Sequence, residues 1–289
     1  MPRAATLLLL LVGLGPSDAL GQGTLFIVGG GTQPDELVTR FVELAGGPGR
    51  AHIAVVPMAS EESEASGLEK VDQLRDFGAT AWVVNLTREE AADPARSATL
   101  DSATGIWFTG GNQSRLTAVL LGTPTLVSMK TRYRAGAVVG GTSAGAAIMS
   151  DSMLTGNQRR PDSVGYYGDD YPVIARSTIE VVAGLGFLHG VLVDQHFIRR
   201  ERHNRLLSAV FERPSLVGVG IDEGTALEVG PDGRWRILGR SAVVVYDARR
   251  ATITDPDQPL LGGRDLRLHV LPAGSSYDPR SGRANLPSR

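Results

Sequence analysis

The sequence predicts an α/β fold in which a mostly parallel sheet carries helices on both faces, a three-layer α/β/α sandwich. Short apolar runs typical of buried strands alternate with helical patterns along most of the chain. Strands that alternate with helices form parallel sheets covered on both sides. Several of the apolar runs also end in glycines or polar residues, and in such sheets the ligand lies at the carboxyl ends of the strands.

The expected elements follow this alternation in order. We expect strands at 24–28, 53–57, 80–84, 105–108, 137–139, 190–194 and 216–221. We expect helices at 35–45, 61–77, 114–121, 125–135, 144–149 and 198–207, and a helix or loop at 89–100. Short antiparallel strands are expected at 234–238 and 242–246, after a Pro-Asp-Gly hairpin turn. Residues 151–176 interrupt the rhythm and are expected to form a long polar loop beside the site.

Composition limits the classes of function. The 289 residues are 42% hydrophobic and 21% charged with a net charge of −2, which is ordinary for a globular protein and argues against nucleic acid as a partner. There is no cysteine, so disulfides, thiolate metal ligands and a thiol nucleophile are excluded. The turn Gly29-Gly30-Gly31 does not fit the dinucleotide pattern Gly-x-Gly-x-x-Gly. We expect neither a cofactor nor a metal.

The two ends of the chain differ from its middle. Residues 1–20 combine Arg3, an apolar core at 7–12 and the small-x-small site Ser17-Asp18-Ala19, which predicts a secretory signal peptide and a secreted or periplasmic protein. No later segment is long and apolar enough to span a membrane. We expect one large domain at 21–250 that carries the functional site, and a partly disordered C-terminal extension at 251–289, which is rich in Pro, Gly and Arg.

Gly141-Thr-Ser143-Ala-Gly145 has the Gly-x-Ser-x-Gly pattern of a nucleophile elbow, a sharp turn between a strand and a helix. A strained serine in such a turn leaves no room for side chains two residues away on either side. Its hydroxyl would be exposed beside the helix N-terminus, where the N–H of Ala144 can stabilise a negative oxygen. No lysine follows the glycines, so the turn is not a P-loop.

A serine nucleophile needs a base and an orienting acid. Of the five histidines, only His196 follows a buried strand at the edge that also carries Ser143. For the acid, Asp222 and Glu223 follow the next strand, and Asp194 precedes His196 by two residues. Asp194 could instead hold a neighbouring side chain or the substrate.

Five motifs occur in a characteristic order: Gly110-Gly-Asn-Gln113, Gly141-Thr-Ser-Ala-Gly-Ala146, Asp194-Gln-His-Phe197, Arg200-x-Arg202-x-x-Arg205-Leu and Gly220-Ile-Asp-Glu-Gly-Thr-Ala226. Together they resemble the cyanophycinases, serine peptidases related to the dipeptidase E family. The similarity covers roughly residues 24–246. It implies a class I glutamine-amidotransferase-like fold.

The resemblance also implies residue roles and a substrate. Ser143 corresponds to the nucleophile, His196 to the base and Glu223 to the orienting acid, while Gly111 and Ala144 would supply the oxyanion N–H groups. The positions expected around the substrate are Gln113, Asp194, Gln195, Arg200, Arg202 and Arg205. The implied substrate is cyanophycin, a poly-aspartate chain with arginine on each β-carboxyl, and the implied product is the β-Asp-Arg dipeptide. Other aspartyl or isoaspartyl peptides stay open as substrates, because residues 155–180 depart from the family pattern.

The arginine cluster has two interpretations. Arginines can clamp substrate carboxylates in a bidentate manner, and Asp169 and Asp170 could meet the guanidinium of the substrate. However, the spacing i, i+2, i+5 does not place Arg200, Arg202 and Arg205 on one helical stripe, so at least one is expected to face solvent or a partner subunit, as in a homodimer.

Two rival functions remain. An α/β-hydrolase esterase has the chain order Ser, acid, His, which Ser143, Asp222 and His269 would satisfy. His269 lies beyond the hairpins, however, and no His-Gly-Gly oxyanion loop is visible. A secreted binding protein that has lost turnover is the non-enzymatic alternative, although a complete set of triad residues argues against it.

Overall fold

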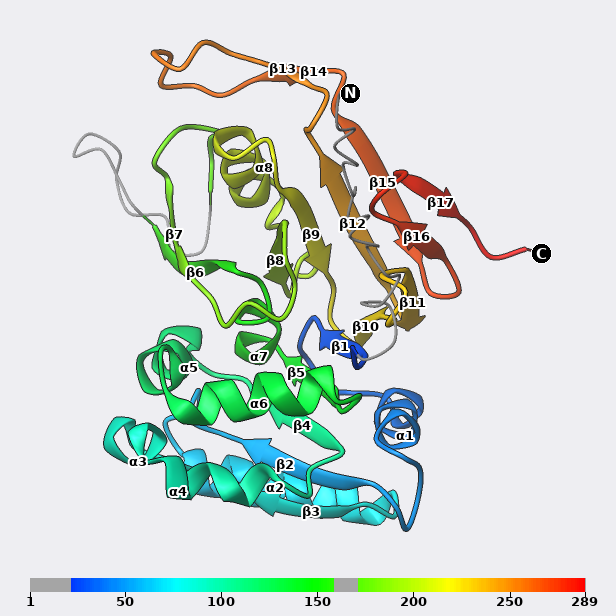
Figure 1. The fold of residues 1–289 in the computed structure, drawn as a ribbon. Coiled ribbons are helices and arrows are strands. Elements are labelled where there is room, and N and C mark those ends of the chain that lie inside the picture. Colours follow the sequence, from blue (N-terminus) through cyan, green and yellow to red (C-terminus); the bar gives the residue numbers. More distant parts are fainter. Residues whose placement is uncertain (1–21, 159–170, 289) are drawn as a thin grey trace, which may run out of the picture.

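The computed structural model describes residues 22–158 and 171–288 (Figure 1). Within these residues, nine strands form the largest sheet, in the order β17-β16-β11-β10-β1-β5-β4-β2-β3. Its parallel half consists of β1 (Leu25–Val28), β5 (Val138–Thr142), β4 (Gly105–Phe108), β2 (His52–Val56) and β3 (Thr80–Val83). The predicted α/β fold with a parallel sheet is therefore confirmed.

Helices cover both faces of this parallel half, and the side chains of each strand alternate between two hydrophobic clusters. In β1, Phe26 and Val28 pack with α1 (Asp35–Leu44) and α2 (Ser63–Asp76). Leu25 and Ile27 point the opposite way, toward α5 (Gln113–Leu120), α6 (Pro124–Arg134) and α7 (Ala144–Ala147). Alternation with a period of two is the reason that a strand can serve two layers. The segment expected to be helix or loop at 89–100 forms α3 (Arg88–Ala92), α4 (Pro94–Ser97) and the 3₁₀ turn η1 (Ala98–Leu100).

The other half of the large sheet is antiparallel. β10 (Thr225–Val229) pairs with β1, and β11 (Trp235–Gly239) pairs with β10 through the expected hairpin. A further four-stranded sheet has the order β15-β12-β9-β8 and contains β8 (Val191–Gln195), β9 (Val217–Ile221) and β12 (Ala242–Asp247). Only β8 and β9 are parallel in it. The strands expected at 190–194 and 216–221 thus belong to a second sheet, which packs beside the first in Figure 1.

Three expectations about local structure were wrong. The loop expected at 151–176 begins with a strand, β6 (Ser152–Gln158), which pairs with β7 (Ile179–Ala183). The helix expected at 198–207 begins later, as α8 (His203–Glu212), because residues 198–202 form turns in which Glu201 has a positive φ of 52°. The elbow helix ends at Ala147 instead of Met149. β6 was not predicted as a strand because much of its sequence is polar.

The C-terminal segment, expected to be a partly disordered extension, contributes strands to both sheets. β15 (Arg267–Pro272) pairs with β12, while β16 (Ser276–Asp278) and β17 (Arg283–Asn285) extend the large sheet from β11. β13 (Thr252–Ile253) and β14 (Gly263–Arg264) form a short ribbon. Leu271 and Tyr277 are buried in the main core, so the described part of 251–288 completes the fold. None of the described helices is long and apolar enough to cross a bilayer.

Candidate active site

Ser143 occupies the sharp turn between β5 and α7. Its backbone has φ 55° and ψ −109°, a conformation that residues other than glycine rarely adopt. The flanking glycines are required by contact: a Cβ on Gly141 would lie 2.6 Å from the carbonyl oxygen of Gly145, and a Cβ on Gly145 would lie 2.4 Å from that of Phe108. The turn therefore has the geometry predicted from the Gly-x-Ser-x-Gly pattern.

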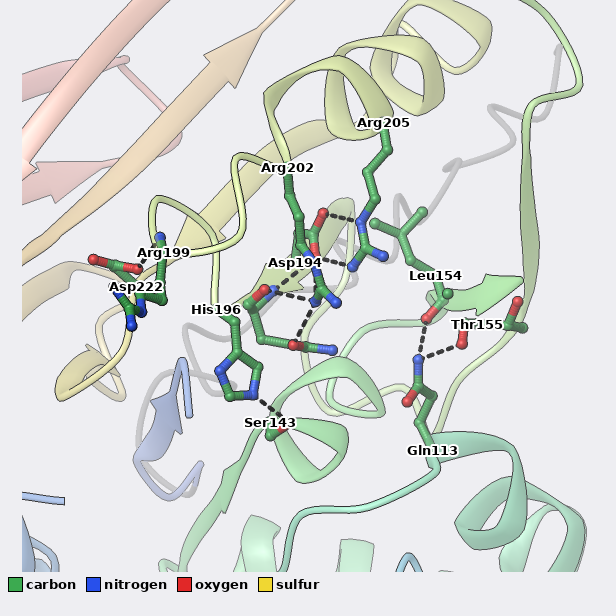
Figure 2. Close-up of polar contacts among 12 residues, drawn as sticks. Gln113, Ser143, Leu154, Thr155, Asp194, His196, Arg199, Arg202, Arg205 and Asp222 are labelled. Atoms are coloured by element: carbon green, nitrogen blue, oxygen red, sulfur yellow. Dashed lines mark hydrogen bonds and ion pairs between the residues drawn. The ribbon is translucent and has the colours of Figure 1, made fainter. Parts of the chain in front are cut away.

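The imidazole of His196 links the serine to a carboxylate. Its Nε2 lies 2.9 Å from the Oγ of Ser143 (Figure 2), and its Nδ1 lies 2.6 Å from the Oε1 of Glu223. His196 is the first residue after β8 and also has a positive φ, of 50°. The structure thus brings together the three residues expected to act as nucleophile, base and acid.

These three side chains come from two sheets. Ser143 follows β5 of the large sheet, whereas His196 follows β8 and Glu223 lies between β9 and β10. The sequence had suggested a single edge of one sheet. The strand ends meet because both sheets pack into the same core, in which Val139, Val193 and Val219 belong to one cluster.

The turn Gly29-Gly30-Gly31 after β1 joins the two halves of the site, a role that the sequence analysis missed. The carbonyl oxygen of Gly29 accepts a 2.6 Å hydrogen bond from the N–H of His196. Gly30 has a φ of 113°, and a Cβ there would lie 2.3 Å from the imidazole ring. A Cβ on Gly31 would lie 3.0 Å from the side chain of Glu223. The three consecutive glycines after a strand were a visible sign that other groups approach this turn closely. The sequence does not say, however, which side chains occupy the space beside the glycines.

The surroundings of His196 favour its neutral form. Burial lowers the pKa of the imidazole, and the positive charges of Arg200 and Arg202 act in the same direction, while Glu223 opposes them. A neutral imidazole can accept the serine proton, so this environment suits a general base.

Asp222, the other candidate acid, is used elsewhere. Its Oδ1 accepts the backbone N–H groups of Ile198 at 3.1 Å and Arg199 at 2.9 Å, and its Oδ2 accepts the hydroxyl of Ser241 at 2.7 Å. The carboxylate thereby holds the turn that follows His196 (Figure 2). His269 lies in β15, with its ring 5.2 Å from that of Tyr277. The Ser143, Asp222, His269 triad of an esterase is therefore not formed.

The predicted substrate residues fall into two groups. Arg200 is exposed, whereas Arg202, Arg205, Asp194 and Gln195 are buried. Arg205 forms a bidentate ion pair with Asp194, with Nε 2.7 Å from Oδ2. Arg202 donates to the backbone oxygen of Gln195 at 2.9 Å and to its Oε1 at 2.7 Å. The buried arginines thus stiffen the end of β8 next to His196 (Figure 2).

Gln113 and the two predicted oxyanion residues lie at the ends of β4 and β5. The Nε2 of Gln113 donates to the carbonyl oxygens of Leu154 at 2.9 Å and Thr155 at 2.6 Å, which ties α5 to β6 (Figure 2). Ala144 is the first residue of α7, and the N–H there has no partner within the helix. Gly111 has a φ of 134° in the turn after β4, and a Cβ would lie 2.2 Å from the carbonyl oxygen of Ala59.

Asp169 and Asp170, the residues expected to meet the guanidinium of the substrate, lie outside the described residues. Among the described residues, no three His, Cys, Asp or Glu side chains gather as metal ligands would.

Comparison with known sequences decides the family. Residues 25–235 match peptidase family S51. This chain belongs to peptidase family S51. A cyanophycinase from Synechococcus elongatus is 36% identical over 273 residues, which cover 90% of this chain and 80% of that protein. A cyanophycinase from Geminocystis herdmanii is 32% identical over 268 residues, covering 89% and 94% of the two chains. The resemblance to cyanophycinases is confirmed, and the chain is a peptidase, a hydrolase.

A solved structure supports the fold independently. The crystal structure of a peptidase from an acI-B1 Actinobacterium aligns with a TM-score of 0.65 at 22% sequence identity, covering 89% of this chain and 97% of that one. The two proteins share their fold, consistent with the class I glutamine-amidotransferase-like architecture.

Proposed function

We propose that this S51 peptidase is a serine peptidase that hydrolyses cyanophycin. The observation that carries the proposal is the unbroken hydrogen-bonded chain from Ser143 through His196 to Glu223, built on a strained serine. The similarity to cyanophycinases supports the substrate class.

In the proposed reaction, Nε2 of His196 takes the proton of Ser143 while the serine Oγ attacks the carbonyl carbon of an aspartyl peptide bond. The negative oxygen of the tetrahedral intermediate lies between the N–H groups of Gly111 and Ala144. The imidazolium, stabilised by Glu223, then gives its proton to the leaving amine. Water, deprotonated by His196, hydrolyses the serine ester in the second half of the reaction.

The proposed product is β-Asp-Arg. Arg200 is exposed on the turn after His196, and we assign it the direct contact with a substrate carboxylate. Arg202 and Arg205 act through Gln195 and Asp194, by holding the end of β8. Gln113 acts in the same way, through β6.

The test is incubation of the purified protein with cyanophycin, followed by mass spectrometry of the products. We expect β-Asp-Arg from the wild-type protein and no product from Ser143→Ala. Poly-α-aspartate is the matched substrate without arginine, and we expect it to be hydrolysed poorly. Equal hydrolysis of both polymers would instead favour a general aspartyl peptidase.

We further propose that residues 1–20 are removed as a signal peptide and that the protein acts outside the cytoplasm. This rests on the charge, apolar core and cleavage site of the sequence, which lie outside the described residues. N-terminal sequencing of exported protein should find a start near residue 20. A start at Met1 would contradict the proposal.

A further inference from the structure

A cavity lies beside the turn that carries Ser143, on the α2 side of the large sheet. It has a volume of about 250 Å³. Its described lining comes from the turn before α1, from α2, and from the ends of β4 and β5: Gln33, Ser66, Glu69, Lys70, Gln73, Trp107, Thr109, Gly110 and Thr142. Thr142 directly precedes Ser143, and a Cβ on Gly110 would lie 3.5 Å from the Cβ of Ser143. The cavity therefore begins one residue from the proposed nucleophile.

Lys70 places a buried cation in this cavity. The residue is 7% exposed and lies on the buried face of α2. The other buried residues of this helix are apolar or small. Its Nζ donates to the Oε1 of Gln33 and the Oε1 of Gln73, both at 2.6 Å, and lies 4.3 Å from the centre of the Trp107 ring. Lysine is almost never this deeply buried without a charged partner, and these partners are neutral.

The burial also changes the proton affinity of the amine. Desolvation lowers the pKa of Lys70 to about 7, and the negative charge of Glu69 acts in the opposite direction. Among the described lining residues, Glu69 is the only other charged one. An anion beside Nζ would relieve the cost of the buried charge and raise this pKa.

The remaining polar atoms favour an anion over a cation. The indole Nε1 of Trp107 and the Oγ1 of Thr142 are buried, and neither has a hydrogen-bond partner among the described residues. Both groups can donate. The two glutamine oxygens and the Trp107 ring, which would suit a guanidinium, already face the ammonium group of Lys70. A second cation would meet repulsion, whereas a carboxylate would be attracted by the ammonium group of Lys70 and would offer acceptors to the two unpartnered donors of the lining residues.

We propose that this cavity is a subsite for a free carboxylate of the peptide substrate, with the ammonium group of Lys70 as its counter-ion and Thr142 and Trp107 as further donors. The proposal rests on the proposed peptidase function, because Thr142 connects the cavity to Ser143. The carboxylate is either that of the arginine or the backbone carboxylate of the aspartate, and both occur in β-Asp-Arg.

The test measures binding of β-Asp-Arg by titration calorimetry at pH 6 in the full-length Ser143→Ala protein. Two derivatives, amidated at the arginyl or at the aspartyl carboxyl, distinguish the two carboxylates. We expect one amide to bind about tenfold to a hundredfold more weakly than the free dipeptide, the range for loss of a charge-assisted hydrogen bond. Adding Lys70→Met should weaken binding of the free dipeptide to the level of that amide, and should leave binding of that amide unchanged.

Lys130→Met is the matched control, since Lys130 is the other lysine of the sequence and lies in α6, and it should leave binding unaltered. Thr142→Val removes one donor at nearly constant volume and should weaken binding of the same carboxylate, which keeps the test valid if Lys70→Met does not fold.

Affinity of the Ser143→Ala protein for the free dipeptide should fall severalfold between pH 6 and pH 8.5, and this dependence should disappear in Lys70→Met.

Two results would overturn the subsite: equal binding of the acid and both amides, or undiminished binding in both Lys70→Met and Thr142→Val. These failures differ from failure of the peptidase function, which would appear as intact cyanophycin after incubation with the wild-type protein.

Discussion

At the scale of single residues, His196 derives its role from the place where β8 ends. Its backbone is anchored to Gly29, and each ring nitrogen has one partner, Ser143 or Glu223. His269, by contrast, lies in β15 beside Tyr277. His196 and His269 are each followed by an apolar residue in the sequence, yet the structure gives them unrelated surroundings.

The first prediction follows from this contrast. His196→Ala removes the side chain whose Nε2 lies 2.9 Å from the Ser143 hydroxyl, and hydrolysis of cyanophycin should fall on the order of 10⁴-fold or more. His269→Ala is the matched control and should keep near wild-type kcat/KM. The assignment of the base is wrong if the two variants show the reverse pattern.

The second prediction concerns the pH dependence of activity. His196 must be neutral to act as a base, and its pKa is lowered by burial and by Arg200 and Arg202. The acidic limb of kcat/KM should therefore lie below the ordinary histidine pKa of about 6.5. Arg200→Ala removes one positive charge, so the imidazolium becomes easier to form and the limb should move to higher pH. Arg199→Ala, which removes an exposed charge from the adjacent position, should not move it.

At the scale of elements, the turn after β1 determines whether the base and acid can reach the serine. A Cβ at Gly30 would overlap the His196 ring, and its φ of 113° disfavours any side chain. We predict that Gly30→Ala lowers kcat by about 10²-fold or more, because small displacements of reacting groups have effects of this size. Gly49→Ala has a comparable positive φ of 75° but nothing within 4 Å of the added Cβ, so it should keep full activity. Equal activity of both variants would show that the turn does not position His196.

The elements also show how far sequence reasoning reaches. The strand–helix alternation and the elbow are local patterns, and both were predictable. The sequence pattern also singled out Ser143 and His196, but it left Asp222, Glu223 and Asp194 open as the acid, and only the family resemblance pointed to Glu223. The pairing of β6 with β7 was not predictable, because Gln158 and its polar neighbours look like loop until Ile179 is known to lie opposite. The same applies to Lys70, whose burial depends on Gln33 and Trp107 from distant parts of the chain.

At the scale of the whole molecule, the site lies where two sheets meet, and the C-terminal segment holds strands of both. β15 pairs with β12 in the smaller sheet, and β16 pairs with β11 and so extends the large sheet. Trp235 and Tyr277 pack against each other with ring centres 5.2 Å apart. The two sheets are therefore completed by residues that the family match, which ends at 235, does not include.

Removal of residues 251–289 should accordingly destabilise the whole protein. We expect a lower melting temperature or loss of soluble protein, because buried surfaces of β11 and β12 become exposed. Removal of residues 286–289 is the control and should leave the melting temperature nearly unchanged, since Leu286 is 64% exposed and follows the last strand. Circular dichroism melting curves of both truncations provide the comparison, and a fully stable 1–250 fragment would show that the segment is dispensable.

The most direct test of the central claim, that Ser143 is the nucleophile of a cyanophycin-degrading triad, is peptide mapping after reaction with a fluorophosphonate. The account predicts one phosphonylated peptide, which contains Ser143. Labelling should be slowed by added cyanophycin and lost in His196→Ala. An adduct on another serine, or labelling of Ser143 that neither cyanophycin nor the His196 substitution affects, would contradict it.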